Sequence, residues 1–212
     1  LAVMSATPSA AGTDRGRHPE RVTQVIGVAI PIPEPHGPVL QAKRAEFNDP
    51  LADSIPAHVT LLGPTEVTDT ELAALVAHLE QIGADARPFS MVLRGTGTFR
   101  PVSDVVFVQV AQGISDCERL EQRIRSGRWA RELVFPYHPH VTVAHDVSVV
   151  DLDRAFEDLA AYHAAFDVER FWLYRQSPEG AWSPARSFAL GPLRGVGPNA
   201  GSGGQPEVGR PR

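Results

Sequence analysis

The chain has 212 residues, of which 42% are hydrophobic and 21% charged, and this composition excludes disorder over most of its length. Its formal net charge of −5 excludes the broad basic surface that tracks long nucleic acids, so a phosphate-bearing partner should be small or contacted locally. The single cysteine, Cys117, excludes an internal disulfide and a cysteine-based zinc site, and it fits a reducing cytosol. No apolar run reaches the roughly 18 residues that span a membrane, so we expect a cytoplasmic protein with no membrane partner.

The first half of the chain predicts three strands and two helices in alternation, after a flexible leader over residues 1–20. Their ranges are 22–30, 39–48, 57–62, 68–82 and 89–99. The strands are rich in β-branched residues and end at proline or glycine. Thr68 and Glu71 have the spacing of a capping box, in which a hydroxyl and a carboxylate satisfy free amides of the first helical turn.

The second half predicts the same alternation, followed by one further strand. The ranges are 105–110, 115–126, 139–144, 148–159, 166–174 and 188–190. Ser115 with Glu118 has the spacing of a second capping box, and Ser148 with Asp151 that of a third cap. The glycine-, proline- and serine-rich residues 194–212 are expected to form a disordered tail.

The two halves are offset by a nearly constant distance, which indicates an internal duplication. Ile26 and Val108, at the centres of the first strands, are 82 residues apart, and the capped helices that begin at Thr68 and Ser148 are 80 apart. We therefore predict an α+β fold with two lobes, over about 21–100 and 101–193, together forming one domain. Mainly antiparallel sheets would carry helices on their outer faces and enclose a central cleft. We expect a monomer.

A tripeptide occurs at equivalent places in the two halves, as His58-Val59-Thr60 and His140-Val141-Thr142, again 82 residues apart. Side chains alternate between the two faces of a strand, so each histidine shares a face with its threonine. A single histidine on such a strand is usually structural. Two matched copies instead favour a site in which two imidazoles and two hydroxyls face each other across the cleft.

The two motifs resemble those of the 2H phosphoesterase superfamily, and more narrowly of its 2′-5′ RNA ligase and cyclic phosphodiesterase group. The matching segments are Ala57-His58-Val59-Thr60-Leu61-Leu62 and Tyr137-His138-Pro139-His140-Val141-Thr142-Val143-Ala144. The resemblance extends over about residues 22–193. It implies that His58 and His140 are the catalytic pair and that Thr60 and Thr142 bind phosphate oxygens.

The chemistry implied is the opening of a 2′,3′-cyclic phosphate at an RNA or nucleotide end to a 2′-phosphate, without a cofactor or a metal. The imidazole of histidine has a pKa of about 6.5, so near neutral pH one imidazole can act as a base while the other acts as an acid. Hydroxyls can stabilise the negative charge that develops on the non-bridging phosphate oxygens. We take His140 as the base and His58 as the acid. The reverse reaction, 2′-5′ ligation, would use the same site, and a non-catalytic binder of RNA ends or phosphorylated ligands is the alternative.

Other residues are weaker candidates. Tyr137 and His138 could line the pocket or stack on a base, or they could equally just pack the cleft wall. Phe107 and Trp172 are expected in the core. The arginines that might contact phosphate are Arg94, Arg100 and Arg175. His138 and His140, with His58 or His145, have a spacing seen in zinc sites, although Pro139 and the lack of a nearby carboxylate disfavour metal.

Overall fold

The computed structural model describes residues 23–191, so the predicted leader over 1–20 and tail over 194–212 lie outside the described residues. The helices are α1 (His36–Glu46), α2 (Asp69–Asp85), α3 (Ile114–Ile124) and α4 (Val149–Asp158), with a short 3₁₀ turn at Gly127–Trp129. The strands are β1 (Thr23–Pro31), β2 (His58–Thr68), β3 (Phe89–Thr98), β4 (Val105–Gln112), β5 (His140–His145), β6 (His163–Val168), β7 (Arg170–Gln176) and β8 (Trp182–Ala189).

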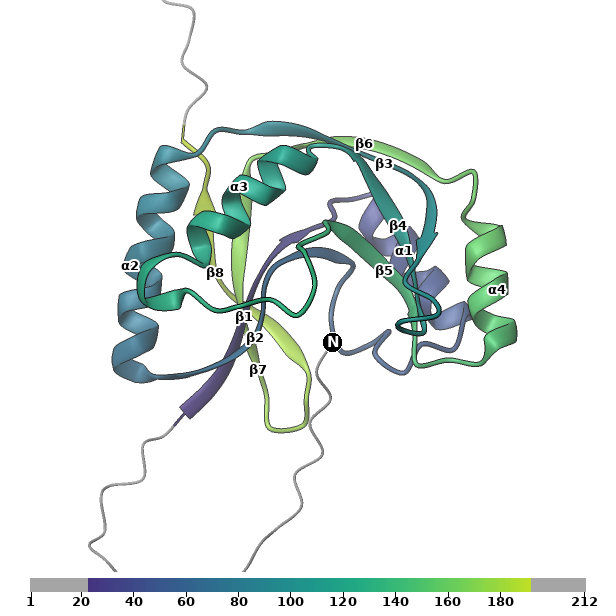
Figure 1. Cartoon of the computed structure of the whole chain (residues 1–212), viewed down its shortest axis with the longest axis horizontal. Coiled ribbons are helices and arrows are strands. Elements are labelled where there is room, and N and C mark those ends of the chain that lie inside the picture. The colour runs from purple at the N-terminus through teal and green to yellow at the C-terminus, as the bar shows by residue number, and fades with distance from the viewer. Residues whose placement is uncertain (1–22, 192–212) are drawn as a thin grey trace, which may run out of the picture.

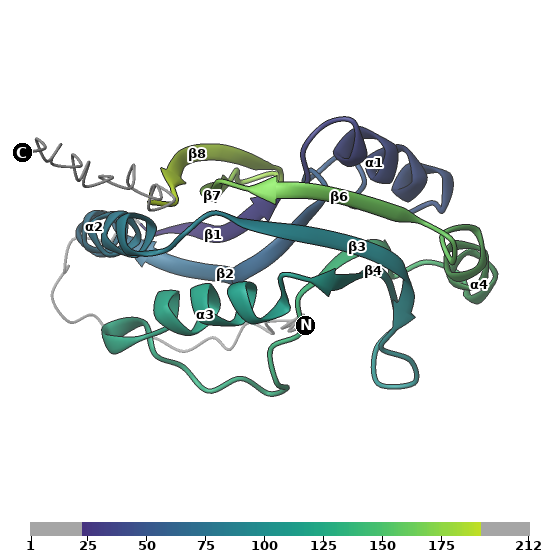
Figure 2. The same cartoon turned by 90° about the horizontal axis from the view of Figure 1, so that it is seen from above.

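Two four-stranded sheets form the centre of the molecule. The first has the order β2-β1-β7-β8 and the second the order β5-β4-β3-β6, and all neighbours are antiparallel. Helices α2 and α4 lie at opposite ends (Figures 1 and 2), with α2 against the first sheet and α4 against the second. The predicted α+β class with antiparallel sheets is therefore confirmed.

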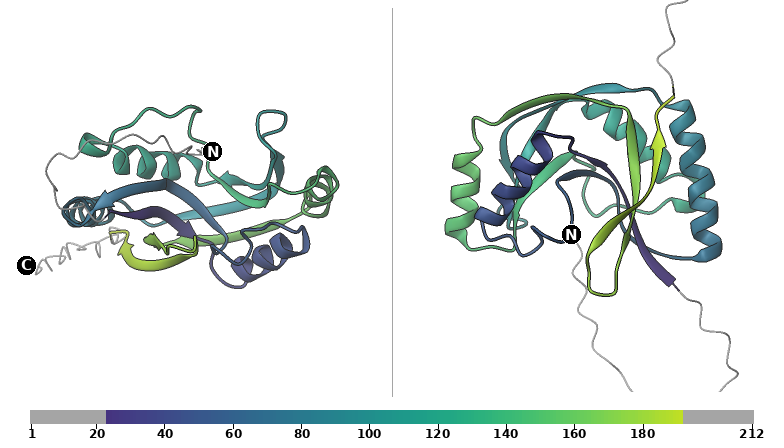
Figure 3. Two further views of the ribbon diagram at one scale, coloured as in Figure 1. Left: turned by 90° about the horizontal axis from the view of Figure 1, so that it is seen from below. Right: turned by 180° about the vertical axis from the view of Figure 1, so that it is seen from behind.

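The sheets do not divide the chain at residue 100, where the predicted lobe boundary lies. Strand β3 comes from the first half of the chain but pairs with β4, and β7 comes from the second half but pairs with β1. Helices cross over as well, because α1 packs against β5 and α3 against β2; the rear view of Figure 3 shows α1 over the second sheet. Each half of the duplication thus completes the sheet of the other.

The duplicated order of elements is present, with one difference in the second half. Strand, helix, strand, helix, strand runs from β1 to β3 and again from β4 to β6. The single strand predicted over 166–174 is instead two strands, β6 and β7, that belong to different sheets and are separated by Glu169. The stretch 166–174 contains no proline or glycine that would mark a break, which is why the sequence prediction missed the change of sheet.

Two of the three predicted helix caps form. The Thr68 hydroxyl accepts from the Glu71 amide while the Glu71 carboxylate accepts from the Thr68 amide, and the Ser148 hydroxyl accepts from the Asp151 amide. The prediction for Ser115 was wrong. Helix α3 begins one residue earlier, after Gly113 in a left-handed conformation (φ 93°), so Ser115 lies inside the first turn.

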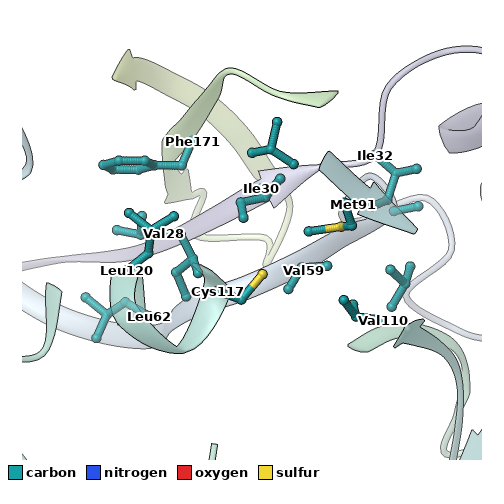
Figure 4. Close-up of a cluster of buried hydrophobic side chains, with 14 of the residues drawn as sticks. Val28, Ile30, Ile32, Val59, Leu62, Met91, Val110, Cys117, Leu120 and Phe171 are labelled. Atoms are coloured by element: carbon teal, nitrogen blue, oxygen red, sulfur yellow. The ribbon is translucent and has the colours of Figure 1, made fainter. Parts of the chain in front are cut away.

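One continuous hydrophobic core joins the two sheets to the helices. In Figure 4, Val28 and Ile30 of β1 and Val59 of β2 lie close to Cys117 and Leu120 of α3, and all five side chains are buried. Cys117 is a free thiol within this core. Across residues 23–191, no helix combines the length and apolar character that crossing a bilayer requires.

Candidate active site

The two His-Val-Thr motifs lie on β2 and β5, which contact one another where the two sheets meet. In each strand the motif residues alternate in exposure. Val59 and Val141 are fully buried, whereas the histidine and threonine on either side of them are only half-buried. The core therefore fixes each strand by one face and leaves the imidazole and the hydroxyl on the other, as predicted.

Each motif histidine is held by the carbonyl oxygen two residues before it. His58 Nδ1 lies 2.7 Å from the Pro56 oxygen, and His140 Nδ1 lies 2.7 Å from the His138 oxygen. A carbonyl only accepts, so the hydrogen of each neutral imidazole is on Nδ1. This leaves Nε2 of both rings as the atom that can take up or give away a proton.

The two imidazoles are close enough for their charges to interact. Burial lowers the pKa of His58 to about 4, against the opposing effect of the Pro56 carbonyl, and the positive charges of Arg44 and His140 contribute to the decrease. Burial also lowers the pKa of His140, and the charge of His138 acts in the same direction. Without a ligand, both histidines are therefore neutral near pH 7.

A cavity of about 150 Å³ borders His58 and Thr60 on the first sheet. Its wall includes Tyr174 of β7 and Trp182 of β8. The Trp182 ring lies over Gly27, where a Cβ would meet the ring at 3.2 Å, so the missing side chain makes room for the indole. The site thus combines one motif with an aromatic wall, while His140 and Thr142 lie outside this cavity.

On the second sheet, the aromatic surface lies around the histidine itself. The His140 ring centroid is 5.0 Å from those of Phe99 and Phe107, and His138 stacks on His140 at 6.1 Å. Phe107 is buried as predicted, and its ring packs against that of His140. Trp172 is only half-buried, and it pairs in register with Ala29, which is the cross-strand partner of Thr60. The prediction that Trp172 belongs to the core was therefore wrong.

The segment that leads into β5 also reaches the first motif strand. The Tyr137 hydroxyl donates to the Thr60 carbonyl oxygen at 2.9 Å, and Arg131 Nη1 donates to the Thr65 hydroxyl at 3.1 Å. Burial raises the pKa of Tyr137, so its hydroxyl stays a donor. Tyr137 therefore links the two motifs, whereas the sequence suggested only a pocket or packing role for it.

The other sequence candidates do not converge on the motifs. Arg94 and Arg175 are exposed, and Arg100 pairs with Asp153 of α4 at 2.8 Å. His145 Nε2 lies 3.5 Å from Asp146 Oδ2. Within the described ranges, no three histidine, cysteine or acidic side chains gather closely enough to hold a metal ion.

Several residues around the motifs were missed by sequence reasoning. They are Tyr174 and Trp182 in the cavity wall, Arg131, and the buried pair Arg44 and Asp49 on and after α1. Trp182 and Tyr174 reach the site only through the pairing of β7 with β1, which no local pattern reveals. Arg44 and Asp49 had one available signal, their opposite charges in the segment that leads to the first motif.

Known proteins resemble this chain in sequence and in fold. A candidate phosphoesterase of Bacillus licheniformis is 28% identical over 145 residues, which cover 68% of this chain and 85% of the relative. The crystal structure of Escherichia coli LigT in its apo form matches with a TM-score of 0.59 at 22% identity, covering 81% of this chain and 99% of LigT. A crystal structure described as a phosphoesterase matches with a TM-score of 0.61 at 20% identity, over 81% of this chain and all of that one.

The family profile of the 2′-5′ RNA ligase superfamily matches residues 32–179. This range contains both His-Val-Thr motifs, the whole of the second sheet, and β2 and β7 of the first sheet. The family and the relatives named as candidate phosphoesterases support a phosphoesterase activity. The chain belongs to the 2′-5′ RNA ligase superfamily.

Proposed function

We propose that the protein is a metal-independent phosphodiesterase that opens 2′,3′-cyclic phosphates at nucleotide or RNA ends to 2′-phosphates. The observation that carries the proposal is the matched pair of imidazoles, each with Nδ1 fixed by a carbonyl oxygen and Nε2 free for proton transfer. A threonine hydroxyl stands beside each of them on the same strand face.

In the proposed reaction, water attacks phosphorus and the bond from phosphorus to O3′ breaks. His140 takes the proton of the attacking water through Nε2, and protonated His58 gives a proton to the leaving O3′. Thr60 and Thr142 donate to the non-bridging oxygens as negative charge builds on them. The same steps with an RNA 5′-hydroxyl in place of water form a bond from phosphorus to O5′ as the bond to O3′ breaks, which gives a 2′-5′ linkage, so the same site would serve ligation.

Ligands of a protein with the same fold suit this proposal. Escherichia coli LigT has been crystallised with phosphate, 3′-AMP, NADP⁺ and ATP. Each of these ligands carries a phosphate group, and all but phosphate carry a nucleoside. The Trp182 ring, which is half-buried in the cavity wall next to His58, would give a nucleobase a surface to stack on.

The direct test is incubation with each of the four 2′,3′-cyclic nucleotides in excess EDTA, with the product identified by ³¹P NMR. We expect a 2′-phosphate from at least one nucleotide, at a rate that EDTA does not change. No turnover of any of them, or of a short RNA with a cyclic end, would instead favour a non-catalytic binder of phosphorylated ends. Activity that EDTA removes and added zinc restores would contradict the metal-independent scheme.

Phosphate binding is expected to take up protons. Both histidines are neutral at pH 7 in the free protein, because His58 has a pKa of about 4 and the pKa of His140 is also lowered. A phosphate anion nearby favours the charged imidazole and raises these pKa values. Binding should therefore strengthen as the pH falls from 8 to 6.

Titration calorimetry with 2′-AMP, in two buffers of different ionisation enthalpy, measures this proton uptake. Replacement of His163, which is exposed on β6, should leave the uptake unchanged, whereas His58→Gln should reduce it. Equal heats in the two buffers at pH 7 would contradict the expectation.

A further inference from the structure

The segment between α1 and β2, residues 47–57, carries the carbonyl that fixes His58, and it is held by contacts from several elements. The Gln41 side chain of α1 donates to the Ile55 carbonyl oxygen at 3.2 Å. The Trp182 amide donates to the Ser54 carbonyl oxygen at 2.7 Å, and the Ile32 amide to that of Ala57 at 3.0 Å. These contacts surround Pro56, whose oxygen lies 2.7 Å from His58 Nδ1.

An ion pair inside the protein anchors the start of this segment. Arg44 of α1 donates to Asp49 Oδ2 through both Nε (3.1 Å) and Nη2 (2.9 Å). The second carboxylate oxygen of Asp49 accepts from the Leu51 amide at 2.8 Å, and the Asp49 amide donates to the Arg44 carbonyl oxygen at 3.1 Å. The Arg44 side chain is 3% exposed and that of Asp49 is 0% exposed.

A buried ion pair is a costly way to hold a loop. Desolvation of two charges often exceeds their attraction, and apolar side chains of similar size would serve packing as well or better. The Arg44 guanidinium offers a reason for keeping the pair, because its charge adds to the larger effect of burial in lowering the pKa of His58. The segment that leads to the second motif has a comparable pair, because Arg125 donates to the buried Glu121 carboxylate and, through Nη1, to the Arg131 carbonyl oxygen at 2.6 Å.

We propose that Arg44 and Asp49 form a positioning pair for His58, because they anchor the loop whose Pro56 carbonyl oxygen holds His58 Nδ1. The proposal rests on the proposed function for its effect on turnover, but its effect on His58 itself can be measured without any substrate.

The test compares two variants with the wild-type protein. Arg44→Met together with Asp49→Leu replaces the pair by apolar side chains of similar size, which should leave the protein folded. We expect the pKa of His58, followed by NMR and assigned with His58→Gln, to rise toward the ordinary value of about 6.5. Turnover of a 2′,3′-cyclic nucleotide should fall about tenfold to a hundredfold, because the imidazole is no longer held in place.

Arg44→Lys separates the two effects and covers the case in which the double variant fails to fold. It keeps the positive charge but loses the second hydrogen bond to the Asp49 carboxylate. We therefore expect a wild-type His58 pKa and a kcat that is lowered several-fold. The matched control is Arg123→Met with Asp85→Leu, which removes the exposed pair between α3 and α2 and should change neither quantity. A folded double variant with a wild-type His58 pKa and wild-type kcat would overturn the proposal. Failure of the wild type to turn over any cyclic nucleotide counts against the proposed function, and the His58 pKa then still tests this pair.

Discussion

Replacement of His140 or His58 by alanine is expected to lower kcat/KM for a 2′,3′-cyclic nucleotide by about 10²- to 10⁴-fold. This is the usual contribution of a positioned acid or base to such a reaction. Each imidazole has its Nδ1 bound to a carbonyl oxygen, so the remaining ring cannot rotate to take over the role of the one that is removed. The double variant should lose little more than the worse single variant, because the two groups act in one step. The measurement is a steady-state assay at pH 7 with product analysis by ³¹P NMR.

The control for this result is a histidine outside the motifs. His163→Ala removes an exposed imidazole from β6 and should leave kcat/KM within twofold of the wild type. Urea unfolding of all variants shows whether lost activity reflects lost structure. A folded His58→Ala or His140→Ala protein with more than one tenth of wild-type activity would refute the paired acid-base scheme.

Removal of the two motif hydroxyls should have the second largest effect. Thr60→Val and Thr142→Val keep the branched shape that suits a strand but lose the donor, and we expect each to lower kcat by about 10²- to 10³-fold. The loss should fall on kcat more than on KM, because these donors act mainly on charge that develops in the transition state. Steady-state kinetics over a range of substrate concentrations separates the two constants.

Thr23→Val is the matched control, since Thr23 is exposed at the start of β1 and away from the motifs. It should leave both constants unchanged. Wild-type kcat in both motif variants would show that the hydroxyls do not contact the reacting phosphate, and the phosphate would then need other donors.

The motifs and the local elements could be predicted from sequence because their signals are local. Alternation along β2 and β5 predicts that the histidine and threonine of each motif share a face, and the Thr68 cap depends on residues only three apart. Ser115 shows the limit of the same reasoning. A capping pattern of similar spacing is present there, but Gly113 offers the left-handed conformation that begins the helix instead.

The walls of the site could not be predicted, because they depend on which distant strands become neighbours. Trp172 lies between two apolar residues, which predicts a position in the core, but its strand pairs with β1 and brings it level with Thr60. Trp182 lies at the site because β8 pairs with β7 and because Gly27 leaves room for the indole ring. The difference in environment between His58 and His140 also depends on tertiary contacts, since the motif residues themselves are the same.

The crossing of β3 and β7 between the sheets also bears on how the chain folds during synthesis. Ala29 of β1 pairs with Trp172 of β7, so the first strand has an open edge until almost the whole described chain has left the ribosome. Pairings between such distant residues slow folding, because a long loop must close before the contact is made. The aromatic wall beside His58 is therefore completed late in folding. A nascent chain that stops before residue 170 leaves the backbone amide and carbonyl groups along one edge of β1 unpaired, and chaperones would have to cover that edge.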